Sequence, residues 1–252
     1  MLDILRKKMS KDITVGIGAY TDIKKIMRIV ENFDLCPLRI LKEEETALLA
    51  LKRGDVDCLV RGTLRSAHFL RAMQKVYEID AHYRIALLGT TDKKYFLLAP
   101  VGIDEGESLR DKIKLAEFGN DFLRTLDIEP KISILSGGRW DDIGRSRYVD
   151  VTIIEARMIA EELGIKHHEI MIEEAIKDSN FIIAPDGISG NLIYRSLVHL
   201  GCGTSHGAVY YPHALDGTVI VDTSRSADLL EYETSIMLAN AFKVMKCSQG
   251  KK

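Results

Sequence analysis

The sequence has little of what marks secreted, membrane-bound or nucleic-acid-binding proteins. Its four cysteines are scattered with no C-x-x-C pair, which argues against structural disulfides and a thiolate zinc site. No apolar run approaches membrane-spanning length, and the charged segment 1–12 is unsuited to a signal-peptide core. A net charge of -2 gives no general attraction to nucleic acid or to a membrane surface. We therefore expect a cytoplasmic protein with no nucleic-acid partner and no membrane partner.

Several catalytic and cofactor motifs are also missing. The sequence contains neither a P-loop nor the G-x-S-x-G turn of a serine hydrolase. Gly16-x-Gly18 begins a dinucleotide fingerprint, but Thr21 stands where the third glycine belongs, which disfavours nicotinamide and S-adenosylmethionine cofactors. A tight first turn explains both glycines. His206 and His213 flank a predicted strand without an obvious third ligand, so we predict no metal site.

What is present is the pattern of an α/β protein. The chain has 252 residues, 46% of them hydrophobic, which is enough to bury a substantial core. Strands and helices alternate, which predicts α/β layers around a largely parallel sheet. The predicted strands are 13–18, 38–41, 57–62, 83–90, 95–101, 131–135, 181–184, 208–211 and 218–222, and the predicted helices are 22–32, 43–53, 63–76, 107–126, 150–163, 171–177, 192–200 and 228–245. The segment 91–94 is either a hairpin turn or a hinge between two lobes.

The stretch 180–191 combines a strand, a loop of small residues and the start of a helix. Pro185 ends the apolar run, and Ser189, Gly190 and Asn191 offer cap-type residues before the helical pattern. The first N–H groups of such a helix are free and its dipole favours an anion. Phosphate or carboxylate could bind there, although most turns of this kind bind nothing.

Three further loops follow predicted strands and carry small or polar residues: 61–63, 136–139 and 222–226. Ligands of open α/β sheets bind outside the carboxyl ends of the strands. Arg61 lies at such an end, and its side chain either contacts a ligand or forms a solvated basic face with Arg65. Two bases near a helix N-terminus oppose the helix dipole unless an anion compensates them.

The last of these loops offers groups for chemistry. Arg225 provides a planar fork for a phosphate or a polarised carbonyl. Glu231, six positions later, is either a general base or a carboxylate that complements the dipole of the last helix.

Four motifs in a fixed order resemble the phosphate acetyl/butyryl transferases, which exchange an acyl group between coenzyme A and phosphate. They are D-C-L-V-R-G at 57–62, I-S-I-L-S-G-G at 132–138, F-I-I-A-P-D-G-I-S-G-N at 181–191 and V-D-T-S-R at 221–225. Within that superfamily the chain looks most like the archaeal MtxX branch, methanogenesis-marker proteins labelled as methyltransferase subunits. The resemblance extends from Asp57 to about Ala241.

This resemblance implies a two-lobed fold akin to isocitrate and isopropylmalate dehydrogenases. Lobe one would hold 1–90 plus 213–252, and lobe two, 91–212, would carry the contact of a homodimer. The cleft between the lobes would bind the ligand. The sequence leaves the cofactor open, with a coenzyme A-type thioester as one candidate. The residues it implies are Ser224, Arg225 and Glu231 for catalysis, and Arg61, Gly62, Ser136, Gly137, Gly138, Asp186, Ser189, Gly190 and Asn191 for ligand binding.

The chain also departs from the family pattern. Arg61 replaces a serine, Ser226 replaces the glycine after S-R, and Pro100 stands where an aspartate is expected. These changes favour an anionic ligand of another shape than acetyl-coenzyme A plus phosphate. The leading hypothesis is a transferase-like protein that binds a small anionic ligand. The alternatives are a methyltransferase of methanogenesis and a non-catalytic ligand sensor or assembly factor on a transferase scaffold.

Overall fold

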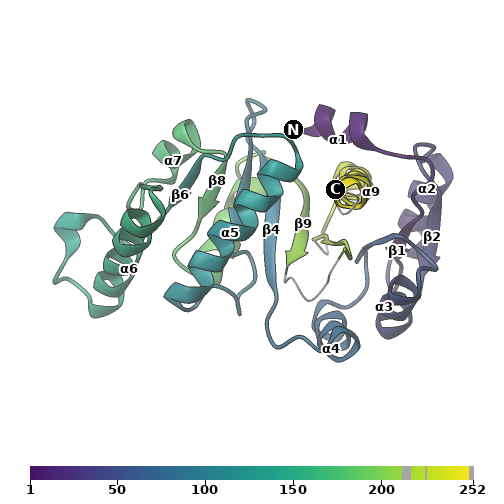
Figure 1. Ribbon diagram of the computed structural model, residues 1–252, viewed down its shortest axis with the longest axis horizontal. Coiled ribbons are helices and arrows are strands. Elements are labelled where there is room, and N and C mark those ends of the chain that lie inside the picture. The colour runs from purple at the N-terminus through teal and green to yellow at the C-terminus, as the bar shows by residue number, and fades with distance from the viewer. Residues whose placement is uncertain (212–216, 225, 250–252) are drawn as a thin grey trace. The chain divides into compact units, whose positions relative to one another are not determined.

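The computed structural model describes residues 1–211, 217–224 and 226–249 (Figure 1). Its contacts divide the chain into two compact units. The first comprises Met1–His82 with Ser205–Lys252, and the second comprises Tyr83–Thr204. Both units alternate helices and strands, which confirms the predicted α/β class. Within the described ranges, no helix combines the length and apolar character needed to cross a membrane.

The first unit contains both ends of the chain. Its elements in chain order are α1 (Leu2–Lys8), β1 (Val15–Gly18), α2 (Ile23–Asn32), β2 (Leu38–Leu41), α3 (Glu44–Arg53), β3 (Cys58–Val60), α4 (Ser66–Tyr77), β9 (Thr204–Tyr211), β10 (Ile220–Asp222) and α9 (Leu229–Gln249). Helix α1 packs on α9. Two residues after α1, Ser10 N–H donates to Asn240 Oδ1 of α9 at 2.9 Å, and Asn240 Nδ2 donates back to the Ser10 carbonyl at 2.9 Å.

The strands of the first unit lie in the order β2-β1-β3-β10-β9. The first four run parallel, with Val15 opposite both Leu38 and Cys58, and β9 runs antiparallel to β10. Because parallel strands end at one edge of a sheet, the loops after β1, β3 and β10 lie together there.

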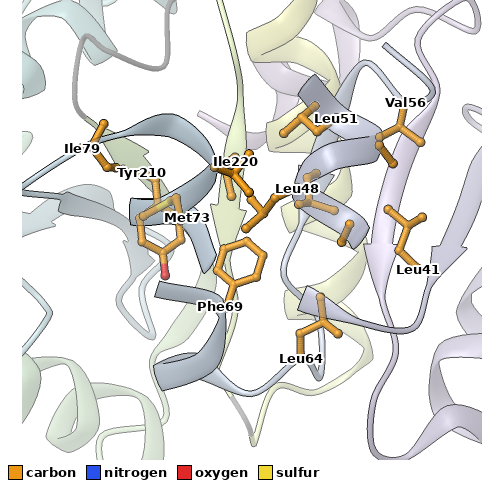
Figure 2. Close-up of a cluster of buried hydrophobic side chains, with 14 residues drawn as sticks. Leu41, Leu48, Leu51, Val56, Leu64, Phe69, Met73, Ile79, Tyr210 and Ile220 are labelled. Atoms are coloured by element: carbon orange, nitrogen blue, oxygen red, sulfur yellow. The ribbon is translucent and has the colours of Figure 1, made fainter. Parts of the chain in front are cut away.

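An apolar cluster fills the space between this sheet and the helices α3 and α4 (Figure 2). Phe69 and Met73 of α4, and Leu48 of α3, are fully buried there. Each such side chain contributes roughly 1.5–3 kcal/mol by leaving water. Helix α3 ends at Gly54 with a φ of 79°, the left-handed conformation that a glycine end favours.

The second unit begins with a hairpin and continues with alternating helices and strands. Its elements are β4 (Tyr83–Gly89), β5 (Tyr95–Ala99), α5 (Leu109–Thr125), β6 (Ile132–Ile134), the 3-10 helix η1 (Trp140–Asp142), α6 (Arg147–Leu163), β7 (Lys166–His167), α7 (Ile172–Asp178), β8 (Phe181–Ile183) and α8 (Gly187–His199). The strand order is β4-β5-β8-β6-β7. Only the β4–β5 pair of this unit is antiparallel. Segment 91–94 is therefore a hairpin turn inside one unit.

The unit boundaries differ from those expected. Strand β4 groups with the second unit because it pairs with β5 across the hairpin, and β9 groups with the first from Ser205 on because it pairs with β10. The sequence pattern also missed α1, η1 and β7, and it placed the start of β9 at 208 instead of Thr204. Each missed segment is short or polar, so its periodicity carries little signal.

Candidate functional site

Two glycines allow the loops after β1 and β3 to touch. A side chain at Gly18 would overlap the Arg61 carbonyl, and one at Gly62, whose φ is 62°, would overlap the Gly18 carbonyl. The backbone contact that results is the hydrogen bond from Thr63 N–H to the Gly18 carbonyl, at 3.0 Å. The glycine at 18 therefore serves a close approach between loops 43 residues apart.

Arg61 is buried at the centre of this edge, with 3% of its surface exposed. Its Nε donates to Asp222 Oδ1, and its two terminal nitrogens donate to the carbonyls of Leu64 and Thr223. The guanidinium thus ties the β3–α4 loop to the β10–α9 loop. The expectation of a solvated basic face is wrong for Arg61, because the charge is paired inside the protein. A ligand contact by Arg61 stays a prediction.

The anion that compensates Arg65 is a side chain of the same unit. Arg65 Nε and Nη2 donate to the two carboxylate oxygens of Glu44, at 2.9 and 3.0 Å. Hydrogen bonding to Arg65 lowers the pKa of Glu44 to about 2, so this carboxylate is ionised at neutral pH. The basic helix start therefore needs no ligand to balance it.

Ser224 and Glu231, two of the predicted catalytic residues, lie within hydrogen-bond distance of each other. Glu231 occupies the first turn of α9, and its Oε1 accepts the backbone N–H of Ser224 at 2.8 Å. The Ser205 side chain, from β9, also hydrogen-bonds the Glu231 carboxyl. The Ser224 hydroxyl lies 2.9 Å from the hydroxyl of Ser226, the residue that replaces the family glycine.

The Glu231 carboxyl is buried, with 5% of the residue exposed. Burial raises its pKa to about 7, and the carboxylates of Asp228 and Asp222 act in the same direction. The hydrogen bonds from Ser224 and Ser205 oppose this rise. A carboxyl with a pKa near 7 can exchange a proton at neutral pH, which is the property a general base needs.

His206 lies in the middle of β9 rather than at its flank. Its Nδ1 is 3.0 Å from Thr234 Oγ1, whose own proton goes to the Leu230 carbonyl at 2.8 Å. If the Thr234 hydroxyl donates to that carbonyl, Nδ1 is the protonated nitrogen that donates to Thr234. Burial lowers the pKa of His206 to about 4, so the ring is neutral at pH 7. His213 and Arg225 lie outside the residues that the structure describes.

In the second unit, Asp186 is a helix cap. Its Oδ1 accepts the Ser189 N–H at 2.7 Å, and its Oδ2 accepts the Tyr148 hydroxyl at 2.6 Å. Burial acts to raise the pKa of Asp186, but the bonds from Ser189 and Tyr148 outweigh it and lower the pKa. Asn191 Nδ2 donates to the Val101 carbonyl at 2.8 Å, and a side chain at Gly190 would overlap the Pro100 carbonyl. All these contacts brace the start of α8.

Ser136 is an internal residue of the β6–α6 loop, with 1% exposure. Its hydroxyl contacts the Gly138 carbonyl at 2.8 Å and His167 Nε2 at 2.9 Å. A hydroxyl has one proton, so if it donates to Gly138, the imidazole donates to Ser136. Gly137 N–H donates to Thr152 Oγ1 at 2.8 Å. These contacts shape the loop and leave a ligand role for residues 136–138 as a prediction.

The predicted site residues that the structure describes thus form one group in each unit. In the first unit, the loop 61–63 meets Asp222 and Thr223 through Arg61. In the second, the first turn of α6 touches both loops, because Tyr148 bonds Asp186 and a side chain at Gly138 would meet Val149. Sequence reasoning missed Ser205, because nothing local links it to a carboxyl 26 positions later.

Comparison with known proteins identifies the family, although no protein-family model matches the chain. Over 235 residues it is 43% identical to the "Putative methyltransferase mtx subunit X" of Methanosarcina mazei, covering 90% of this chain and 79% of that protein. Over 238 residues it is 40% identical to an "Uncharacterized methyltransferase" of Methanocaldococcus jannaschii, covering 89% and 96%. The chain belongs to the MtxX family.

Solved structures show that this MtxX-family chain has a phosphotransacetylase-like fold. The phosphotransacetylase of Streptococcus pyogenes superposes with a TM-score of 0.70 at 16% identity, covering 95% of this chain and 96% of that one. The branched-chain phosphotransacylase of Enterococcus faecalis gives 0.68 at 18% identity, covering 92% and 99%. The MtxX family expected from the motifs is confirmed, and so is the two-unit α/β fold class that the resemblance implied.

Proposed function

We propose that this MtxX-family chain is a transferase-like enzyme of methanogen metabolism that binds a small anionic ligand. The observation that carries the proposal is the buried Glu231 carboxyl, 2.8 Å from the Ser224 N–H and with a pKa of about 7. A phosphotransacetylase-like fold supports acyl transfer as the reaction class, and the family resemblance supports an acyl phosphate and a thiol as reactants.

In the proposed reaction the Glu231 carboxylate accepts the proton of a coenzyme A-type thiol. The thiolate sulfur forms a bond to the acyl carbon, the bond from that carbon to the phosphate oxygen breaks, and phosphate leaves with the electron pair. Ser224 would stabilise the charge that develops on the carbonyl oxygen. Arg225 would polarise that carbonyl or hold the phosphate.

The test is acyl exchange between acetyl or butyryl phosphate and coenzyme A, followed by thioester absorbance. Glu231→Gln and Arg225→Ala should each lose at least about 100-fold in turnover, the lower range for a missing acid–base group or oxyanion contact. Glu233→Gln, an exposed neighbour on α9, should keep wild-type turnover. Wild-type rates in the Arg225 or Glu231 variant would exclude this mechanism. Ligand-dependent thermal stabilisation without any turnover would favour the non-catalytic sensor.

Methyl transfer is the second candidate, and the names of the relatives favour it. Two relatives at 43% and 40% identity are described as methyltransferases. The test is methyl release from a methyl-corrinoid donor to a thiol acceptor, with the same Glu231→Gln variant. Transfer that depends on Glu231 would support it, and no transfer with an active donor would exclude it.

We also propose that the chain forms a homodimer through its second unit. Helix α6 supports this, because its exposed apolar residues lie along one stripe. They are Tyr148, Val151, Ile154 and Met158. Their spacing of three and four residues puts them on one side of the helix, opposite the side that Ile153 and Ala156 bury.

A further inference from the structure

A cavity of about 360 Å³ lies in the first unit, and neither Ser224 nor Glu231 lines it. Tyr20 and Thr21 come from the loop after β1, and the segment 63–68 supplies the remaining wall. Small-molecule sites are typically roughly 300–1,000 Å³, so this cavity suits a compact group rather than a large ligand. Thr63 of the candidate loop 61–63 and Arg65 line it, but none of the residues predicted for catalysis or ligand binding does.

The walls of the cavity are fixed by contacts inside the first unit. Thr63 Oγ1 accepts the N–H groups of Tyr20 and Thr21, at 2.9 and 3.2 Å, which joins the two loops. The Arg65 guanidinium lies 4.3 Å from the centre of the Tyr20 ring. Glu44 holds that guanidinium by both oxygens, so the ring and the cation form a wall that exists before any ligand binds.

The charge of the wall is balanced. Arg65 is paired with Glu44, which is 4% exposed and stays ionised at neutral pH, so the pair leaves no net charge for a phosphate to neutralise. The other lining groups are hydroxyls, aliphatic side chains, a phenol ring and the imidazole of His68. This chemistry suits stacking on Tyr20 and hydrogen bonds to the Thr21 and Ser66 hydroxyls more than it suits a dianion.

A single guanidinium links the cavity to the proposed reacting groups. Arg61 donates to the carbonyl of Leu64, which lines the cavity, and to the carbonyl of Thr223, which precedes Ser224. Both loops end parallel strands at one edge of the sheet. The Arg61 guanidinium therefore connects the wall of the cavity to the backbone that precedes Ser224.

We propose that this cavity binds an uncharged ring bearing a carbonyl or amide, the part of the substrate that does not react. The ring stacks on Tyr20, and its polar edge meets the hydroxyls of Thr21 and Ser66. Specificity then comes from an uncharged group in the cavity, while the anionic end lies at Ser224 and Glu231. The placement of the anionic end at Ser224 and Glu231 rests on the proposed function. Binding of the ring in the cavity does not.

The test follows backbone amide resonances of the full-length ¹⁵N-labelled protein with two probes, benzamide and inorganic phosphate. Benzamide should shift the amides of Thr21, Ser66 and Ala67 in a saturable way, and phosphate should leave them in place. Ala67→Phe fills the cavity and should weaken benzamide binding at least about tenfold, or ~1.4 kcal/mol. Arg71→Phe adds the same ring at an exposed position of α4 outside the cavity and should bind benzamide like wild type.

Three results would overturn the proposal: phosphate shifts at these amides, equal benzamide binding in the Ala67→Phe variant, or no benzamide shift up to its solubility limit. The readout needs no turnover. If benzamide binds as expected while Glu231→Gln retains acyl exchange, the cavity site stands and the proposed reaction falls. If exchange depends on Glu231 and benzamide does not bind, only the cavity proposal falls.

Discussion

At the scale of single residues, Glu231 makes the stability of the fold depend on pH. Its pKa rises from 4.5 to about 7 on folding, so the neutral form is the one that folding favours. This stabilisation is complete below pH 4.5 and is lost as pH rises through 7. At about 1.4 kcal/mol per pKa unit, ionising Glu231 costs on the order of 3 kcal/mol.

His206 acts in the opposite direction over much of the same range. Burial lowers its pKa from 6.5 to about 4, so its contribution is present above pH 6.5 and is lost as pH falls through 4. The two effects partly cancel between about pH 4.5 and 6.5. The wild-type stability curve therefore hides both, and a variant is needed to separate them.

We predict that Glu231→Gln gains stability relative to wild type as pH rises. The difference in unfolding free energy between variant and wild type should grow by on the order of 2–3 kcal/mol from pH 4.5 to pH 7.5, because glutamine never ionises. Urea denaturation at the two pH values measures it. Glu233→Gln, exposed on the same helix, should show no such growth. Parallel curves for Glu231→Gln and wild type would contradict the raised pKa.

The sequence could place Glu231 at the start of the last helix but could not choose between its two roles. That choice depends on burial and on Ser205 and Ser224, which the fold brings together. Arg61 is a second example. The two interpretations of Arg61, a ligand contact and a solvated basic face, both left out Asp222, its partner 161 positions away.

At the scale of elements, Arg61 is the contact that holds the β3–α4 loop against the β10–α9 loop. We predict that Arg61→Met destabilises the protein by roughly 3–5 kcal/mol, because it removes the guanidinium that compensates the charge of the buried Asp222 carboxylate. Arg61→Lys should recover little, since an ammonium lacks the fork that reaches Asp222, Leu64 and Thr223 together. Urea denaturation measures both.

The matched control is Arg53→Met, which removes an arginine from the exposed pair with Asp55. The Arg53 side chain is 62% exposed, and surface pairs of this kind contribute about 0–1 kcal/mol. If Arg61→Met and Arg53→Met destabilise the protein equally, the proposal that Arg61 stabilises the contact between the two loops is wrong.

Most helices and strands could be predicted from the sequence because the patterns that indicate them are local. The acids, bases and glycine of α3 predict its ends, and the apolar runs predict most strands. The reason for Gly18 was not readable, because the Arg61 carbonyl that excludes a side chain there belongs to another strand. Local patterns specify elements, and contacts between distant elements specify the site.

At the scale of the whole molecule, the four motifs indicated the fold class and the superfamily, and the unit boundaries depended on strand pairing that the sequence does not show. The motifs were recognisable because each contains the end of a predicted strand and the loop after it. Ligands of open α/β sheets bind outside such strand ends. Oligomeric state has no comparable local signal. It depends on which apolar residues the folded chain leaves outside.

For this chain, the exposed apolar residues of helix α6 support the proposed homodimer. A helix that buries one apolar side and exposes another needs a partner for the second, since exposed apolar patches mark interaction surfaces. Val151 and Ile154, exposed by 46% and 49%, lie in the middle of the stripe. We therefore expect the wild-type protein to elute at twice its chain mass of 28.3 kDa in size-exclusion chromatography with light scattering.

Ile154→Glu should shift that mass to the monomer, because a carboxylate in the centre of an apolar interface loses its water without gaining a partner. Ile103→Glu makes the same change at a 70% exposed isoleucine outside α6, so it should leave the dimer intact. Equal thermal stability of the monomeric variant at low protein concentration would show that the second unit folds without its partner. If wild type is already a monomer at about 100 μM, or if both variants dissociate alike, α6 is not the interface, and its apolar stripe needs another occupant.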